Sequence, residues 1–333
     1  MGKAIAKRIG MATWLAAVAL LGPPEREARA QAFPANPIEL TVPFAAGAAP
    51  DAVARALADG MSKLLGQQVV VMNRPGAGGA IGYKYVQSRK PDGYTLVLNS
   101  NSVSTAYHAG MMPFDYTAFQ PIARVTIELP VLAVQASAPY ANLKDVVAYA
   151  KQHPGQLRVG NTGVGSHMHL TSDAFFTGQA SDVTQVPFPT TSHVTSLLGG
   201  HIDAIVTLPG SIAQHTKAGT IKVLGVLGSA REPVFPAVPT ANEQGYTFQS
   251  DLWRGIAAPK GTPPEVVARL ETAIRTTVQS AEFRQQGERF GFLPAYQPTD
   301  VFTKTIITED AVIAKMMAKT ATPPAAQSAA QPK

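Results

Sequence analysis

Two stretches of small and hydroxyl-bearing residues have the pattern of an anion-binding site. The first, TVPFAAGAAPDAVAR at residues 41–55, runs from an apolar strand through a small-residue loop into a helix opened by Pro50 and Asp51. The second, VGNTGVGSHMHL at residues 159–170, runs from a short strand through glycines into a helix whose first turn holds Ser166. The first N–H groups of a helix have no partner within it, so such turns direct backbone donors outward. Two of them predict a cleft that binds a carboxylate.

The same residues also have purely structural explanations. Pro50 and Asp51 suit the first turn of any helix. Gly163 and Gly165 could serve only to allow a tight turn, and Ser166 could serve only as the helix N-cap. These alternatives stay open at the level of sequence.

Enzyme chemistry has weaker support than binding. Ser166 in GVGSH is displaced by one position from the G-x-S-x-G elbow, and no glycine follows where that motif requires one. His169 and Asp173 are four residues apart on a helix, which alone does not make a catalytic triad. We therefore expect a binding protein and no catalytic residue.

No metal or cofactor is expected either. His167 and His169 are two apart on a helix and point to different faces. The sequence contains no cysteine, which excludes disulfides and thiolate metal sites. The glycine-rich run at 76–82 has GxGxxxG spacing and lacks the acidic residue of a dinucleotide site, so it predicts a structural turn.

The beginning of the chain has the pattern of an export signal. Lys3, Lys7 and Arg8 precede an apolar run at 11–21, and Ala-Arg-Ala at 28–30 is an A-x-A cleavage signature. We expect residues 1–30 to be a cleaved signal peptide, with the exact cleavage site left open. No later segment approaches the ~20 apolar residues of a membrane span.

Length and charge limit the remaining possibilities. About 300 residues follow the signal, enough for two domains of ordinary size. The net charge of +6 includes five basic and two acidic residues of the signal, which leaves about +3. This charge is scattered and too weak to indicate nucleic-acid binding.

Strand-like and helix-like segments alternate in two series. The first has strands at 38–42, 68–72 and 94–98, with a helix that ends at Gly66 and another at 81–88. The second has strands at 131–134, 157–159, 183–186, 202–206 and 223–227, with helices at 143–153, 166–177, 191–198 and 211–218. This order favours parallel sheets in two α/β lobes.

The C-terminal region predicts helices at 263–278, 282–289 and 299–319 without a strand series of their own. They must therefore pack on an existing lobe, and we expect the first, reached by a return strand near 253–257. We therefore expect lobe 1 at 31–130 plus 250–319, lobe 2 at 131–249, and a hinge near Pro130 and Ser250. Residues 320–333 are rich in Ala, Pro and Gln and predict a disordered tail.

The motifs, in this order, resemble those of the extracytoplasmic solute receptors of tripartite tricarboxylate transporters, the TctC-like or Bug family. The matching phrases are VPFAAGAAPDAVAR, VVVMNRPGAGGAIGYKYV, KPDGYTLVLNS, GNTGVGSHMHL, LLGGHIDAIV and WRGIAAPKGTP. They extend over nearly the whole chain after the signal, so the resemblance is more specific than any single glycine motif.

The resemblance implies a periplasmic binding protein of two α/β lobes, each a largely parallel sheet flanked by helices, that close on a small organic acid. The partners it implies are the large and small membrane subunits of a tripartite transporter. It further implies that backbone amides and hydroxyls hold the ligand carboxylates. The candidate residues are Phe44, Ala45, Gly47, Ala48, Asp51, Asn101, Ser102, Asn161, Thr162, Gly163, Gly165, Ser166, Thr190, Thr191, Asp203, Trp253 and Arg254.

Some positions depart from the family pattern. Ala48, Ala49 and Pro50 precede Asp51, which removes a hydroxyl from the first loop. Arg254 is a candidate for a bidentate carboxylate contact, against the simpler interpretation of a surface residue. Trp253 is either a ligand wall or part of the core.

Two other functions stay open. One is a secreted α/β enzyme, and the other is a sensory receptor that presents its closed form to a signalling partner. The sequence does not choose the ligand among dicarboxylates, tricarboxylates, aromatic acids, acidic amino acids and nicotinate-like compounds.

Overall fold

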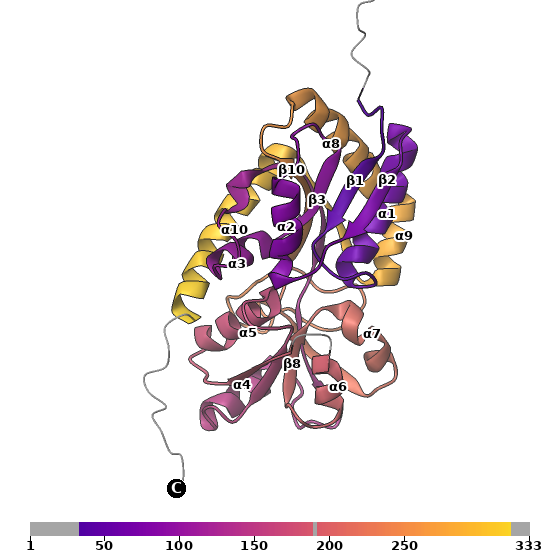
Figure 1. Ribbon diagram of the computed structural model, residues 1–333. Helices are drawn as coiled ribbons and strands as arrows, with labels where there is room; N and C mark the ends of the chain where they lie inside the picture. The colour runs from indigo at the N-terminus through magenta and orange to yellow at the C-terminus, as the bar shows by residue number, and fades with distance from the viewer. Residues whose placement is uncertain (1–32, 189–191, 321–333) are drawn as a thin grey trace, which may run out of the picture. The chain divides into compact units, whose positions relative to one another are not determined.

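The computed structural model describes residues 33–188 and 192–320, and the chain from Asn36 onward forms one compact unit. The expected signal peptide, the expected tail beyond 320, and the candidates Thr190 and Thr191 lie outside the described residues. The unit contains two β-sheets with helices on their faces (Figure 1).

The first sheet has six strands in the order β11-β4-β10-β3-β1-β2. β2 and β3 run parallel to β1, whereas β10 is antiparallel to both β3 and β4, and β11 is antiparallel to β4. The strands are β1 (Ile38–Val42), β2 (Val69–Asn73), β3 (Thr95–Ser100), β4 (Phe119–Glu128), β10 (Leu252–Pro259) and β11 (Leu293–Gln297).

Helices associate with this sheet in two groups. The helix α1 (Ala49–Leu65) contacts α8 (Pro264–Val278) and α9 (Ala281–Phe290), while α3 (Ser102–His108) contacts α2 (Ala80–Gln87) and α10 (Thr299–Thr320) (Figure 1). Short 3₁₀ turns lie at Ala77–Gly79 and Tyr116–Ala118. α1 buries Val53, Leu57 and Met61, the apolar positions at helical spacing, and Gly66 ends it in the left-handed conformation at φ 69°.

The second sheet has five strands in the order β7-β6-β8-β5-β9. β6 is parallel to β7 and β8, and β5 is antiparallel to β8 and β9. Its strands are β5 (Val131–Gln135), β6 (Arg158–Asn161), β7 (Thr184–Pro187), β8 (Ala204–Thr207) and β9 (Ile221–Val226). Its helices are α4 (Leu143–Gln152), α5 (His167–Gly178), α6 (Ser192–Leu198) and α7 (Pro209–Lys217).

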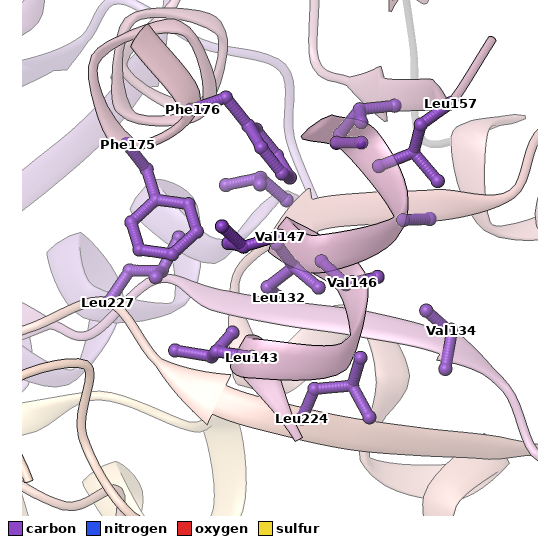
Figure 2. Close-up of a cluster of buried hydrophobic side chains, with 14 of the residues drawn as sticks. Leu132, Val134, Leu143, Val146, Val147, Leu157, Phe175, Phe176, Leu224 and Leu227 are labelled. Atoms are coloured by element: carbon purple, nitrogen blue, oxygen red, sulfur yellow. The ribbon is translucent and has the colours of Figure 1, made fainter. Parts of the chain in front are cut away.

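A separate apolar core lies on each face of this second sheet. Figure 2 shows Leu132 of β5 among side chains of α4 and the aromatic rings of Phe175 and Phe176 of α5. The next strand residue, Ala133, belongs to the core that contains Leu197 of α6. Because successive strand residues point to opposite faces, one short strand fills both cores.

The two-sheet α/β architecture is confirmed, but both sheets are mixed rather than largely parallel. The return strand β10 enters between β3 and β4 in the antiparallel direction, and β5 does the same between β8 and β9. The sequence reading missed α3, β4 and β11, and β11 shows that the C-terminal region does carry a strand.

The strands of the first sheet come from residues 38–128 and 252–297, and those of the second from 131–226. The expected lobe boundaries and hinge, which concern movement of these parts, stay predictions.

Candidate functional site

The turn between β1 and α1 is organised by the carboxylate of Asp51. This side chain is buried, and its Oδ2 accepts hydrogen bonds from the Gly47 N–H at 2.9 Å and from Arg55 Nε at 3.0 Å. Its Oδ1 accepts one from Asn73 Nδ2 at 3.0 Å. Burial raises the pKa of Asp51, but these hydrogen bonds and the Arg55 charge outweigh it and lower the pKa overall. Asp51 is therefore an ionised clamp within the turn.

This clamp leaves other backbone donors of the turn available. Within the described residues, the N–H groups of Ala45, Ala46 and Ala49 have no hydrogen-bond partner, and all three residues are exposed. Asn73 Nδ2 also donates to the Phe44 carbonyl at 3.1 Å, which ties the loop to β2. The turn is thus a fixed loop that presents backbone donors to solvent at the start of a helix.

The turn between β6 and α5 is closed by side chains of its own. Ser166 Oγ accepts the His169 N–H at 3.1 Å, which makes Ser166 the N-cap, and it also accepts a hydrogen bond from Thr162 Oγ1 at 3.2 Å. The Gly165 N–H donates to His169 Nδ1 at 3.0 Å. Burial lowers the pKa of His169, opposed by the charge of Asp173, so the ring stays neutral and can accept this bond.

The first part of the same turn presents free donors. In the part of the chain that the structure describes, the N–H groups of Thr162, Gly163 and Val164 have no partner. The Val164 side chain is 73% exposed, so this segment lies at the surface. The structural explanation of Ser166 as a cap is correct, and the donors before it remain available to a ligand.

Asn161 does not share this exposure. It is fully buried, and its Nδ2 donates to Gln185 Oε1 at 3.0 Å. Asn161 is the last residue of β6 and supports the turn from below the surface.

Asn101 and Ser102 follow β3 and are held by neighbouring side chains. Asn101 Oδ1 accepts the Trp253 N–H at 3.0 Å, and its Nδ2 donates to Glu309 Oε2 at 2.5 Å. Ser102 Oγ lies 2.9 Å from the Tyr83 hydroxyl and 2.7 Å from Ser100 Oγ. Both polar atoms of the Asn101 side chain therefore have a partner, while Ser102 is half-buried within a hydroxyl cluster.

Trp253 and Arg254 belong to the interior. Trp253 is 2% exposed and packs edge-on against Phe302, with ring centroids 5.0 Å apart. Arg254 is 4% exposed, so its interpretation as a surface residue is wrong. Its Nε and Nη2 donate to the two carboxylate oxygens of Glu128 at 3.1 and 2.7 Å. The bidentate geometry expected toward a ligand is thus used within the protein.

Asp203 is not brought to the two turns. Its Oδ1 and Oδ2 accept hydrogen bonds from the Arg158 guanidinium at 2.8 and 3.0 Å. Arg158 begins β6 and Asp203 directly precedes β8, so the pair lies at the amino ends of these parallel strands. The turn that contains Ser166 follows the carboxyl end of β6.

Sequence reasoning missed Glu309, which accepts hydrogen bonds from Asn101 and from the indole of Trp253. Burial raises its pKa to about 7; Trp253 and Arg124 oppose this shift and Asp251 adds to it. A signal was present, because Glu309 interrupts the buried helical stripe of Phe302, Ile306 and Ile313. A carboxylate at a core-facing position indicates a buried polar contact.

A second polar cluster joins α5 to the segment before β10. Ser250 Oγ lies 2.7 Å from Thr171 Oγ1 and 3.2 Å from His167 Nε2. Burial lowers the pKa of His167 to about 4; the Ser250 hydrogen bond opposes this shift and Arg254 adds to it. His167 is therefore a neutral structural contact at neutral pH.

Over residues 33–188 and 192–320, no group of three His, Cys, Asp or Glu side chains is placed to hold a metal ion. No helix in this part of the chain is both long and apolar enough to cross a membrane.

Comparisons with known proteins place this chain in a family. Residues 53–320 match the family described as "Tripartite tricarboxylate transporter family receptor", TctC. The protein BugT of Bordetella pertussis is 34% identical over 257 residues, covering 75% of this chain and 79% of that protein. A TctC solute-binding protein from Polaromonas is 34% identical, with a TM-score of 0.76 over 86% of this chain and 99% of that one.

Two further similar structures hold carboxylate ligands. MatC of Rhodopseudomonas palustris, solved with bound malate, is 28% identical with a TM-score of 0.73, covering 86% of this chain and 100% of that one. Another R. palustris protein, solved with adipate, is 28% identical with a TM-score of 0.75, covering 86% and 98%. The matched family consists of receptors that bind solutes, so the expectation of a non-enzymatic binding protein is confirmed. This chain belongs to the TctC, or Bug, family of periplasmic solute-binding receptors, as its ordered motifs predicted.

Proposed function

We propose that this receptor captures a small dicarboxylate in the periplasm and delivers it to the large and small membrane subunits of a tripartite transporter. The observation that carries the proposal is the turn after β1, where the N–H groups of Ala45, Ala46 and Ala49, at the start of α1, have no partner among the residues that the structure describes. Backbone donors at a helix N-terminus suit a carboxylate because the helix dipole and the N–H groups act together.

In this proposal the second carboxylate is bound by the turn after β6. The N–H groups of Thr162, Gly163 and Val164 supply donors there, next to the Ser166 hydroxyl. The binding of malate and adipate by similar proteins supports a ligand with two carboxylates. The proposed contact set is the backbone of residues 44–49 and 162–164, chiefly the N–H groups of Ala45, Ala46, Ala49, Thr162, Gly163 and Val164, with the hydroxyls of Ser102 and Ser166. The sequence candidates Thr190 and Thr191 remain in it.

The buried candidates have supporting roles in this proposal. Asp51 holds the first turn and Asn161 supports the second from the end of β6. Asn101 joins the segment after β3 to Trp253, which anchors the strand that returns to the first sheet. We leave out Arg254 and Asp203 as ligand contacts because Glu128 and Arg158 already pair with them.

Capture would follow from closure of two lobes, residues 31–130 plus 250–319 and residues 131–249, and release from their opening. A dicarboxylate that contacts one turn from each lobe favours the closed form by its differential affinity. The basic and apolar pattern of residues 1–30 supports export by a cleaved signal peptide.

A thermal-shift screen tests the proposal. Dicarboxylates of four to six carbons should raise the melting temperature, since a ligand that binds only the native state stabilises it by mass action. Monocarboxylates of the same length are the matched controls, and chromatography should recover the bound compound unchanged. Stabilisation by the monocarboxylates alone, or a converted product, would contradict the proposal.

A further inference from the structure

A groove of about 650 Å³ lies between α9, β11 and the segment at 232–234. Its walls are mainly apolar and include Ile127, Val234, Val278, Phe292 and Leu293. None of its lining residues belongs to either turn, so a ligand here would not compete directly for the proposed carboxylate contacts.

One of the carboxylates that line this groove, that of Glu232, is buried and forms no ion pair within the described residues. Glu232 is 2% exposed, and its Oε1 accepts a single long hydrogen bond from the Val234 N–H at 3.4 Å. Across the described residues, this N–H is the only donor to the Glu232 carboxylate, and no ion pair involves it. Burial raises the pKa of Glu232 to about 7; the Val234 hydrogen bond opposes this shift and the nearby charge of Glu128 adds to it.

We propose that this groove is a second binding site for an apolar ligand that carries a protonated amine, with the ammonium against Glu232. A buried carboxylate without a partner is costly, and an ammonium supplies both the opposite charge and hydrogen-bond donors. The hydrocarbon part of the ligand contacts the apolar wall, where Phe292 and Tyr296 provide ring surfaces.

The surrounding charges favour a cation over the carboxylates proposed for the two turns. Arg284 and Glu288 also line the groove and carry opposite charges. Both side chains are exposed, so water screens these charges. Glu128 is paired with Arg254. Among the lining residues that the structure describes, Glu232 is therefore the buried charge without an ion pair, and it would repel a carboxylate ligand.

Titration calorimetry with 2-phenylethylamine tests this site, with 2-phenylethanol as the matched neutral probe. The amine should bind at least tenfold more tightly than the alcohol at about pH 8, where the Glu232 carboxyl is mostly ionised. At about pH 6 the carboxyl is mostly protonated, so the affinity for the amine should fall by about tenfold. The amine itself stays protonated throughout, as a lysine does.

Two variants localise the effect. Glu232→Gln should lower the affinity for the amine at pH 8 by at least tenfold and remove its pH dependence. Glu288→Gln, on the exposed part of the same groove, should change the affinity by less than about threefold because its charge is screened. Equal binding of amine and alcohol, or unchanged amine affinity in a folded Glu232→Gln variant, would overturn the proposal. If that variant fails to fold, equal amine affinity of the unmodified protein at pH 6 and pH 8 would overturn it instead.

Discussion

The carboxylate of Glu309 on α10 accepts a hydrogen bond from the indole Nε1 of Trp253 on β10. The same carboxylate oxygen accepts Asn101 Nδ2, so one side chain joins the C-terminal helix, the return strand and the segment after β3. Phe302 and Ile306 of α10 pack around Trp253 and enclose this contact in an apolar cluster. The C-terminal helix is thus part of the support for a candidate ligand segment.

Stability should depend on pH through the burial of the Glu309 carboxyl. The folded-state pKa of Glu309 is raised from 4.5 to about 7, so its contribution to stability is fully present below about pH 4.5 and is lost as the pH rises toward 7. Glu232 adds a loss of the same sign over the same range. Urea unfolding at a series of pH values should show a smaller decline in Glu309→Gln than in the unmodified protein. Glu282→Gln, an exposed change on α9, is the control, and an identical decline in all three proteins would refute the assignment.

Breaking the buried pair of Glu128 and Arg254 should be costly. Glu128→Leu leaves the guanidinium without its bidentate partner at a site where both side chains are almost fully buried. We expect the free energy of unfolding to fall by ~3–5 kcal/mol. The double variant Glu128→Leu/Arg254→Met should recover most of this loss, because no charge then remains unpaired. A double variant as unstable as the single one would show that the pair itself, rather than its unpaired remnant, controls stability.

Substitutions of Ser166 distinguish its structural role as a helix cap from a role in ligand binding. Ser166→Ala removes the cap on the His169 N–H and should lower the free energy of unfolding by ~1 kcal/mol. If the hydroxyl also contacts ligand, dicarboxylate affinity should fall by a further ~0.5–1.5 kcal/mol, the value of one neutral hydrogen bond. Ser166→Thr keeps the cap and should restore stability. Lower stability with unchanged affinity would reduce Ser166 to a cap alone.

Ala46 offers the cleanest probe of the first turn. Its N–H is free among the described residues and its side chain is exposed, so Ala46→Asp adds a negative charge without disturbing the core. The added carboxylate and the ligand carboxylate repel each other, so the affinity for a dicarboxylate should fall by at least tenfold, or ~1.4 kcal/mol. Ala46→Asn is the uncharged control of the same shape. Gly47 is less suitable because its N–H is bound to Asp51 and its φ of 79° disfavours other residues.

The sequence predicted most elements and both turns, since apolar periodicity and glycine placement are local properties. It did not reveal β4, whose residues 119–128 include Pro121 and Arg124 and do not alternate cleanly between buried and exposed positions. It also missed the antiparallel entry of β10, which depends on pairing between segments more than 120 residues apart.

The candidate site was harder to predict because long-range partners decide which polar groups are free. Asp51 and Arg254 looked like ligand contacts in isolation. Asp51 accepts hydrogen bonds from Gly47, Arg55 and Asn73, and Arg254 donates to Glu128. Only folding brings those partners to them, so local residue type could not separate a supporting side chain from one that faces a ligand.

The most direct test of the central claim is titration calorimetry of the purified protein with adipate and malate, alongside hexanoate and butyrate. If the two turns each receive a carboxylate, at least one dicarboxylate should bind with one-to-one stoichiometry. Its affinity should exceed that of the monocarboxylate of the same length at least tenfold, because the second turn then gains its own charged partner. Equal affinity for a dicarboxylate and its monocarboxylate counterpart would contradict the account.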